Sequence, residues 1–151
     1  MKKIVLMGRS ECGKTTLTQA LRGEKIEYNK TQNHFDVVID TPGEYAQTKS
    51  LGYALALYSY EADVIGLLLS STEPYSLYPP NVTPMANREV IGIVTKVDVE
   101  GGDPKRAERW LRLAGCKKIF FVNSKANEGV PELLEYLREE GDIMPWEEEN
   151  Q

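Results

Sequence analysis

Eight residues near the start of the chain have the types and the spacing needed to bind a chain of phosphates. The stretch Gly8-Arg9-Ser10-Glu11-Cys12-Gly13-Lys14-Thr15 has the Walker A pattern G-x-x-x-x-G-K-[ST] and directly follows the apolar run Ile4-Val5-Leu6-Met7. Glycines let the backbone wrap around an anion, and a helix that starts near Lys14 adds the positive end of its dipole. Lys14 is expected to reach the β- and γ-phosphates, and the Thr15 hydroxyl is expected to bind Mg²⁺. The stretch therefore predicts a phosphate-binding loop.

A second motif, D-x-x-G, follows the strand expected at residues 36–39. Asp40 comes directly after that strand, and Gly43 comes three residues later. In a protein with a phosphate loop, a carboxylate at this place supports Mg²⁺ and the glycine N–H senses a γ-phosphate. The pattern is common by itself, but its position after the phosphate loop makes it strong evidence for a nucleotide site.

Two further polar stretches follow apolar runs later in the chain. Thr95-Lys96-Val97-Asp98 stands where ligands bind in open α/β sheets, at the carboxyl end of a strand. A carboxylate at Asp98 can accept from guanine N1–H and from the exocyclic amine, a pair that adenine lacks, so the motif favours GTP over ATP. Asn123-Ser124-Lys125-Ala126 predicts a second base-contacting loop, although a plain turn before the last helix fits these residues equally well.

Size and composition limit the classes of protein that fit. The 151 residues are enough for one domain, predicted at residues 1–141, and residues 142–151 are expected to form an acidic tail on the surface. The net charge of −5 disfavours nucleic acid and anionic membranes as partners. Two cysteines give no disulfide framework, and no apolar run has the length of a membrane span or a signal peptide, so we expect a cytoplasmic protein.

Apolar runs alternate with helical patterns, which is typical of a mostly parallel sheet covered by helices. The expected strands are residues 3–7, 36–39, 64–70, 90–95 and 118–123, with a short edge strand at 26–28. The expected helices are residues 14–22, 48–61, 103–115 and a last helix from Val130 that ends at Gly141. Four prolines between residues 71 and 88 leave room there for one short helix near Pro84.

Four motifs in this order resemble the Ras-like small GTPases. The opening residues 4–17, the triplet Lys30-Thr31-Gln32, the stretch Asp40-Thr-Pro-Gly-Glu-Tyr45 and the run from Val90 to Lys96 are more closely similar to the EutP/PduV family. The resemblance implies a Ras-like P-loop three-layer α/β fold, with a mostly parallel sheet of five or six strands and helices on both faces. It also implies a role in ethanolamine or propanediol utilisation, at bacterial microcompartments.

The chain departs from the Ras-like pattern in two places. Asp40 follows Lys14 more closely than in ordinary small GTPases, which predicts a shortened or missing second strand and leaves Thr31 as the candidate switch threonine over Mg²⁺. Glu44 stands where Ras-like enzymes have a glutamine that orients water, and an acceptor-only carboxylate beside a triphosphate predicts slow hydrolysis.

The resemblance and the motifs together define the candidate site. Lys14, Thr31 and Glu44 are expected to act in catalysis, and Thr15, Thr31 and Asp40 are expected to hold the metal. The residues expected to bind the nucleotide are Gly8, Arg9, Ser10, Glu11, Cys12, Gly13, Lys14, Thr15, Thr16, Gly43, Thr95, Lys96, Asp98, Ser124, Lys125 and Ala126.

Three functions remain open at this stage. The first is a GTP-binding protein that hydrolyses GTP slowly with Mg²⁺. The second is a phosphotransferase of the acetate kinase type that uses ATP. The third is a nucleotide-loaded adaptor without catalysis, which docks on a microcompartment shell through its N-terminal segment or through Tyr75 and Tyr78. For both tyrosines, packing over the edge of the sheet fits the sequence equally well.

Overall fold

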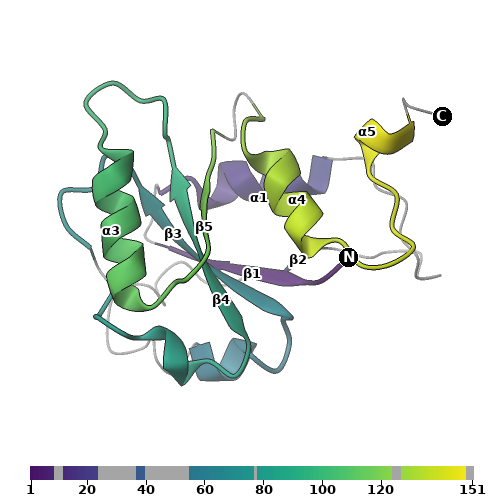
Figure 1. Cartoon of the computed structure of the whole chain (residues 1–151), viewed down its shortest axis with the longest axis horizontal. Helices are drawn as coiled ribbons and strands as arrows, with labels where there is room; N and C mark the ends of the chain where they lie inside the picture. The colour runs from purple at the N-terminus through teal and green to yellow at the C-terminus, as the bar shows by residue number, and fades with distance from the viewer. Residues whose placement is uncertain (9–11, 24–36, 40–54, 77, 124–126, 149–151) are drawn as a thin grey trace.

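Five apolar segments form a parallel sheet in the order β2-β1-β3-β4-β5 (Figure 1). The computed structural model describes residues 1–8, 12–23, 37–39, 55–76, 78–123 and 127–148. Within these ranges the strands are β1 (Ile4–Met7), β2 (Val38–Ile39), β3 (Val64–Ser70), β4 (Glu89–Thr95) and β5 (Ile119–Phe121). All four strand pairings are parallel. The strands predicted at residues 3–7, 36–39, 64–70, 90–95 and 118–123 are confirmed, although β2 and β5 are shorter than expected.

The central strands are buried on both faces, as their nearly continuous apolar sequences require. All seven residues of β3 and all four of β1 are buried. Alternate side chains point into two separate cores. Leu6 and Leu68 belong to the core that contains α1 and α4, whereas Met7 and Leu67 belong to the core that contains α3.

The helices that fill these cores are α1 (Lys14–Gly23), α3 (Pro104–Ala114) and α4 (Val130–Leu137). Residues 55–58 are also helical and lie in the predicted helix 48–61, whose first residues, 48–54, fall outside the described part. The predicted edge strand at residues 26–28 falls outside it too, so the expectation that this strand is shortened or missing stays a prediction. No helix in the described ranges is long and apolar enough to cross a membrane.

Helix α3 shows how local sequence sets the ends of an element. The Asp103 carboxylate accepts from the backbone N–H of Arg106 at 3.0 Å, and Pro104 opens the first turn. Gly115 ends the helix with a φ of +115°, in the left-handed region that favours glycine. Both ends match the prediction.

The connection from β3 to β4 runs through an irregular segment instead of a long helix. Parallel strands are usually joined by a helix, but the four prolines here exclude one. In its described part, which we name the crossover segment (residues 71–76 and 78–88), the regular element is the 3₁₀ helix η2 (Thr83–Met85). The segment packs along α3, where Asn81 N–H donates to Leu113 O at 2.7 Å. The short helix predicted near Pro84 is confirmed.

The structure corrects the sequence prediction at the carboxyl end of the chain. Helix α4 ends at Leu137, since Arg138 has extended backbone, and it does not reach Gly141. The expected surface tail is instead docked up to residue 147. Asp142 and Met144 are 1% and 0% exposed, and Trp146 in α5 (Pro145–Glu148) packs against the core.

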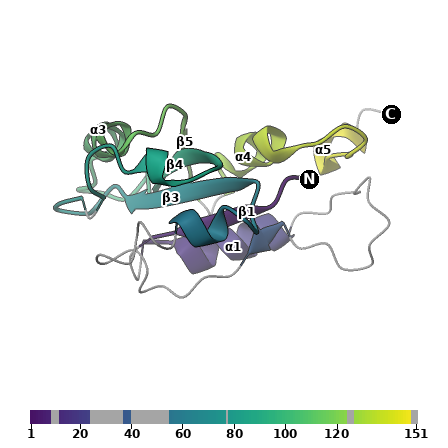
Figure 2. The ribbon, with the colours of Figure 1, turned by 90° about the horizontal axis from the view of Figure 1, so that it is seen from below.

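A buried ion pair explains this docking. The amino group of Met1 is bonded to the Asp142 carboxylate and lies 3.1 Å from Glu139 Oε1. Figures 1 and 2 both place the start of the chain beside α4 and the connection to α5. Arg138 adds ion pairs to Glu135 at 3.0 Å and to Glu147 at 2.8 Å.

Candidate functional site

The phosphate-loop sequence starts where β1 leaves the sheet. A Cβ atom placed on Gly8 would lie 2.5 Å from Cys12 Sγ and 3.1 Å from Leu68 Cβ. Real Cβ atoms essentially never come as close as 2.5 Å to another atom, so the close approach of residue 8 to Cys12 favours glycine at this position. Residues 9–11, which include Arg9, Ser10 and Glu11, lie outside the described part.

The other glycine of the motif sets the start of α1. Gly13 has a φ of +99°, and its carbonyl accepts the N–H of Leu17 at 2.9 Å. Helix α1 then begins at Lys14, as predicted, so the backbone N–H groups of its first turn lie next to the loop. Backbone donors and the positive end of the helix dipole therefore face the end of β1, where an anion would be stabilised.

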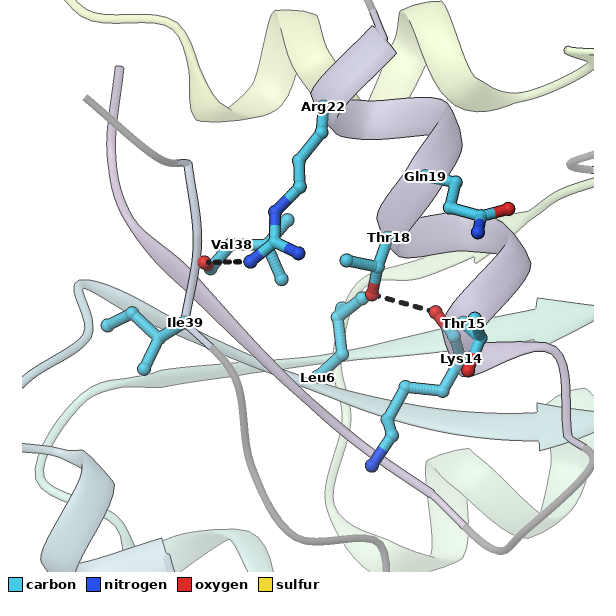
Figure 3. A pocket seen from close by; sticks show the side chains of 8 residues that line it. All are labelled: Leu6, Lys14, Thr15, Thr18, Gln19, Arg22, Val38 and Ile39. Carbon is cyan, nitrogen blue, oxygen red and sulfur yellow. Dashed lines mark hydrogen bonds between the residues drawn. The ribbon is translucent and has the colours of Figure 1, made fainter. Parts of the chain in front are cut away.

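A pocket of about 420 Å³ opens beside this helix start, between α1 and β2 (Figure 3). Two hydrogen bonds shape it: Thr18 Oγ1 donates to Lys14 O at 2.8 Å, and Arg22 Nη2 donates to Val38 O at 3.2 Å. Lys14 and Arg22 both extend from α1 toward β1 and β2. The residues that line the pocket are Leu6, Lys14, Thr15, Thr18, Gln19, Arg22, Val38 and Ile39.

Strand β4 brings the T-K-x-D motif to the phosphate loop. Thr95 is its last residue and is 2% exposed. Its hydroxyl donates a hydrogen bond to the carbonyl of Cys12, across the end of the intervening strand β3. The two motifs, 83 residues apart in the sequence, are thus in direct contact.

The rest of the T-K-x-D motif forms a tight turn. Lys96 has a φ of +56°, an uncommon conformation for a residue with a side chain. Its carbonyl accepts from Ser71 Oγ at 2.6 Å and from the N–H of Val99 at 3.2 Å. Asp98 is exposed at the tip of this turn, where its carboxylate is accessible to a ligand.

Two residues of the crossover segment were not among the predicted site residues. Ser71 bonds the Lys96 carbonyl, and the Tyr78 hydroxyl lies 2.6 Å from Leu68 O and 3.1 Å from Met7 O. Burial raises the pKa of Tyr78 well above its ordinary value. Of the two readings that the sequence leaves open for Tyr78, packing is the one found. Tyr75 is 50% exposed.

Cys12 is a packed residue of the loop. It is 1% exposed, and burial raises the pKa of its thiol, although the N–H and the charge of Lys14 act in the other direction. A reactive thiol needs a lowered pKa and solvent access, and Cys12 has neither. Cys12 is therefore a small, packed residue of the loop and not a reactive thiol.

The described part of the predicted site lies at the carboxyl ends of β1 and β4. It contains Gly8, Cys12, Gly13, Lys14, Thr15, Thr16, Thr95, Lys96 and Asp98. The described ranges hold no cluster of three His, Cys, Asp or Glu side chains suited to a metal ion. The predicted residues Thr31, Asp40, Gly43, Glu44, Ser124, Lys125 and Ala126 lie outside the described part.

Comparison with known proteins identifies the family. The sequence profile of the PduV-EutP family, described as ethanolamine utilisation and propanediol utilisation, matches residues 1–139. The chain belongs to this family. It is 45% identical to the propanediol utilization protein PduV of Citrobacter freundii, over 91% of this chain and 93% of that protein.

Another relative carries a different description. The chain is 31% identical to EutP of Salmonella typhimurium, described as a probable acetate kinase, over 91% of this chain and 89% of EutP.

Among solved structures, the G domain of the T. maritima FeoB iron transporter superposes with a TM-score of 0.57 at 25% identity. The match covers 91% of this chain and 96% of that domain, so this member of the PduV-EutP family has the fold of the P-loop GTPases.

Proposed function

We propose that the protein binds GTP with Mg²⁺ and hydrolyses it slowly. The observation that carries the proposal is the hydrogen bond from Thr95 to the Cys12 carbonyl, because it holds the phosphate-loop and T-K-x-D motifs at one edge of the sheet. A nucleotide needs both a phosphate site and a base site at a fixed spacing. The carboxyl edge of a parallel sheet is where such ligands bind.

The proposed selection of guanine rests on the turn that follows β4. Asp98 is exposed on a turn whose backbone is held at Lys96 by two hydrogen bonds. A carboxylate fixed in this way can accept two hydrogen bonds from the N1–H and the amino group of guanine. Adenine would leave the carboxylate without these partners, and that loss makes the discrimination steep.

The residues around the start of α1 fit a triphosphate and Mg²⁺. The closely packed Gly8, the left-handed Gly13 and the first N–H groups of α1 form a cradle for phosphate oxygens, and Lys14 adds a positive charge. The exposed Thr15 hydroxyl is a hard oxygen ligand of the type that Mg²⁺ prefers. Bound Mg²⁺ would neutralise charge on the β- and γ-phosphates. Asp40 and Thr31 are proposed to complete its ligand set.

Slow turnover is proposed from Glu44. Catalysis of phosphoryl transfer depends on orienting the attacking water and stabilising charge. A carboxylate beside the γ-phosphate adds negative charge and cannot donate as a glutamine amide does. Glu44 therefore replaces a group that would speed hydrolysis in Ras-like enzymes.

A second function is favoured by one observation, the 31% identity with a relative described as a probable acetate kinase. Such an enzyme would transfer the γ-phosphate of ATP to acetate at the same phosphate loop. Formation of acetyl phosphate from ATP and acetate, abolished in Lys14→Ala, would establish this activity. Its absence from purified wild-type protein would exclude the acetate kinase.

The biological setting is proposed from the family. Relatives are named for propanediol and ethanolamine utilisation, so we propose that the protein serves one of these pathways in the cytoplasm at a microcompartment. A shell protein that co-purifies with the nucleotide-loaded form would support this setting. Tight nucleotide binding without turnover in the same sample would favour an adaptor over an enzyme.

Calorimetric titration of nucleotide-free protein with GTP and with ATP, each with Mg²⁺, tests the proposal. We expect GTP to bind at least about tenfold more tightly than ATP, a difference of about 1.4 kcal/mol. Asp98→Asn should weaken GTP binding, whereas Glu100→Gln, at an exposed neighbour in the same turn, should not. Equal affinity for the two nucleotides would exclude the guanine assignment and favour the acetate kinase.

A further inference from the structure

The crossover segment contacts both loops that the proposed function uses. Its first residue, Ser71, bonds the turn after β4, and Tyr78 bonds the strand ends beneath the phosphate loop. We propose that Ser71 and Tyr78 are positioning residues, with Tyr78 fixing the start of the phosphate loop and Ser71 fixing the base-reading turn. The identity of the ligand in this inference rests on the proposed function.

Tyr78 acts where β1 and β3 separate. The last pair of the β1–β3 ladder is Met7 with Leu67, and at Gly8 the chain turns away into the phosphate loop. One buried hydroxyl joins the carbonyls on the two sides of this point, those of Met7 and Leu68. Because burial raises the pKa of Tyr78, the hydroxyl keeps the proton that it donates. The carbonyl of Met7 is bonded directly to the nitrogen of Gly8, so its orientation sets that of the loop.

Ser71 acts on the turn after β4 through main chain and side chain together. Its N–H donates to Thr95 O at 3.0 Å, and its Oγ donates to Lys96 O at 2.6 Å. The N–H of Asp103 in turn donates to Ser71 O at 2.7 Å. A Cβ on Gly102 would lie 2.3 Å from Ser71 Oγ, so the end of the turn closes over the serine. Ser71 therefore holds Lys96 in its uncommon backbone conformation, two residues before Asp98.

The hydrogen bonds of Ser71 and Tyr78 are important for the position of the two loops because the crossover segment has little regular structure. A helix in this place would be held by its own backbone hydrogen bonds and could leave the loops to other groups. Here the side chains of Ser71 and Tyr78, together with the main chain of Ser71, hold the segment against the loops. Each bond ends on main chain next to residues proposed to touch the ligand, so removing it should displace those residues.

Ser59 provides a matched control. Its buried hydroxyl donates to Leu55 O at 2.6 Å and accepts the N–H of Asn87 at 3.0 Å. Like Ser71, it fastens one end of the crossover segment, but the end that lies before β4 and away from the loops. Ser59→Ala removes a buried hydroxyl of the same kind without touching the proposed site.

The test is titration of wild type, Tyr78→Phe, Ser71→Ala and Ser59→Ala with GTP and with ATP in Mg²⁺. Thermal melting followed by circular dichroism first fixes a temperature at which every variant is folded. We expect Tyr78→Phe to weaken both nucleotides by a similar factor, about fivefold to tenfold, because it changes the phosphate site. Ser71→Ala should lower the GTP-to-ATP preference about fivefold, because it changes the base site. Ser59→Ala should change neither affinity by more than about twofold.

The outcomes separate this inference from the proposed function. If the wild type binds neither nucleotide, both the proposed function and this inference are excluded. Wild type that binds GTP, with Tyr78→Phe and Ser71→Ala indistinguishable from Ser59→Ala, would leave the proposed function standing and overturn the inference. A change of nucleotide preference in Tyr78→Phe would also overturn it. If Ser71→Ala fails to fold, the comparison of Tyr78→Phe with Ser59→Ala decides the role of Tyr78.

Discussion

The hydroxyl of Thr95 donates a hydrogen bond to the carbonyl of Cys12, and this one bond joins the two halves of the candidate site. Both residues are buried, at 2% and 1% exposure, so water cannot replace either partner. Thr95 also packs against Gly13, where an added Cβ would come within 3.4 Å of the threonine Cβ. The end of β4 and the phosphate loop are therefore a single packed unit.

Thr95→Val tests this unit. Valine has nearly the shape of threonine, so the substitution removes the donor and leaves the buried Cys12 carbonyl without it. We expect a loss of about 1 to 3 kcal/mol in the free energy of unfolding, measured by chemical denaturation. GTP affinity should fall as well, because the phosphate loop loses its attachment to β4. Thr95→Ser keeps the hydroxyl, and a serine variant as weak as the valine variant would contradict the role of the bond.

Lys14→Ala tests the phosphate site without touching the core. The side chain lines the pocket beside α1, and alanine is the best helix former at the start of this helix. We expect nucleotide binding measured by calorimetry to fall at least about a hundredfold, since the proposed charge partner of the β- and γ-phosphates is lost. The melting temperature of the nucleotide-free protein should stay close to that of wild type. Undiminished GTP affinity in this variant would exclude the proposed phosphate site.

The ion pair between Met1 and Asp142 supplies a stability test remote from the site. Asp142→Asn keeps an oxygen that can accept the Glu139 N–H, bonded at 3.0 Å in the wild type, but removes the negative charge beside the buried amino group of Met1. Breaking a buried pair in this way should cost about 3 kcal/mol of unfolding free energy, measured by denaturant titration. Glu140→Gln, at an exposed neighbour, should have little effect. Equal stability of the two variants would show that the pair is not needed to dock residues 142–147.

Local patterns in the sequence were enough for most of the fold. The run from Val64 to Ser70 is nearly continuous in apolar residues and forms β3 over the same residues. Helix α3 carries its own start and stop signals in Asp103, Pro104 and Gly115. The end of α4 and the docking of the tail depend instead on contacts such as that of Asp142 with Met1, 141 residues away. No local pattern near Gly141 contains that information.

For the candidate site too, some features could be predicted from the local sequence and others could not. The glycines of the phosphate loop were predictable because the motif demands a close turn and a left-handed residue, and Gly8 and Gly13 meet those demands. The roles of Ser71 and Tyr78 were not, because each side chain bonds a carbonyl brought near by the topology of the sheet. A serine directly after a wholly buried strand was the available signal for Ser71. Tyr78 lies among prolines, and the composition of that segment fits a buried and an exposed tyrosine equally well.

Cys116 gives the protein a predicted pH dependence. Its thiol is 2% exposed, and burial raises its pKa from an ordinary value of 9.0 to about 12. Between these two values the unfolded chain releases the thiol proton while the folded chain keeps it, so unfolding becomes more favourable as pH rises. Below about pH 9 the contribution is complete, and above it the free energy of unfolding should fall by up to about 1.4 kcal/mol per pH unit from this group.

Denaturant titrations of wild type and Cys116→Ala at pH 8, 9 and 10 measure this contribution. The alanine variant leaves a small cavity, which lowers its stability by an amount that does not depend on pH. Burial raises the pKa of Tyr78 well above its ordinary value, so this neighbour of the Cys116 charge keeps its proton in the folded state of both proteins, and the difference between them reports on Cys116. We expect wild type to be the more stable at pH 8 and its advantage to shrink as the pH rises to 10. An advantage that stays constant over this range would show that the folded protein does not hold the Cys116 proton more tightly than the unfolded chain does.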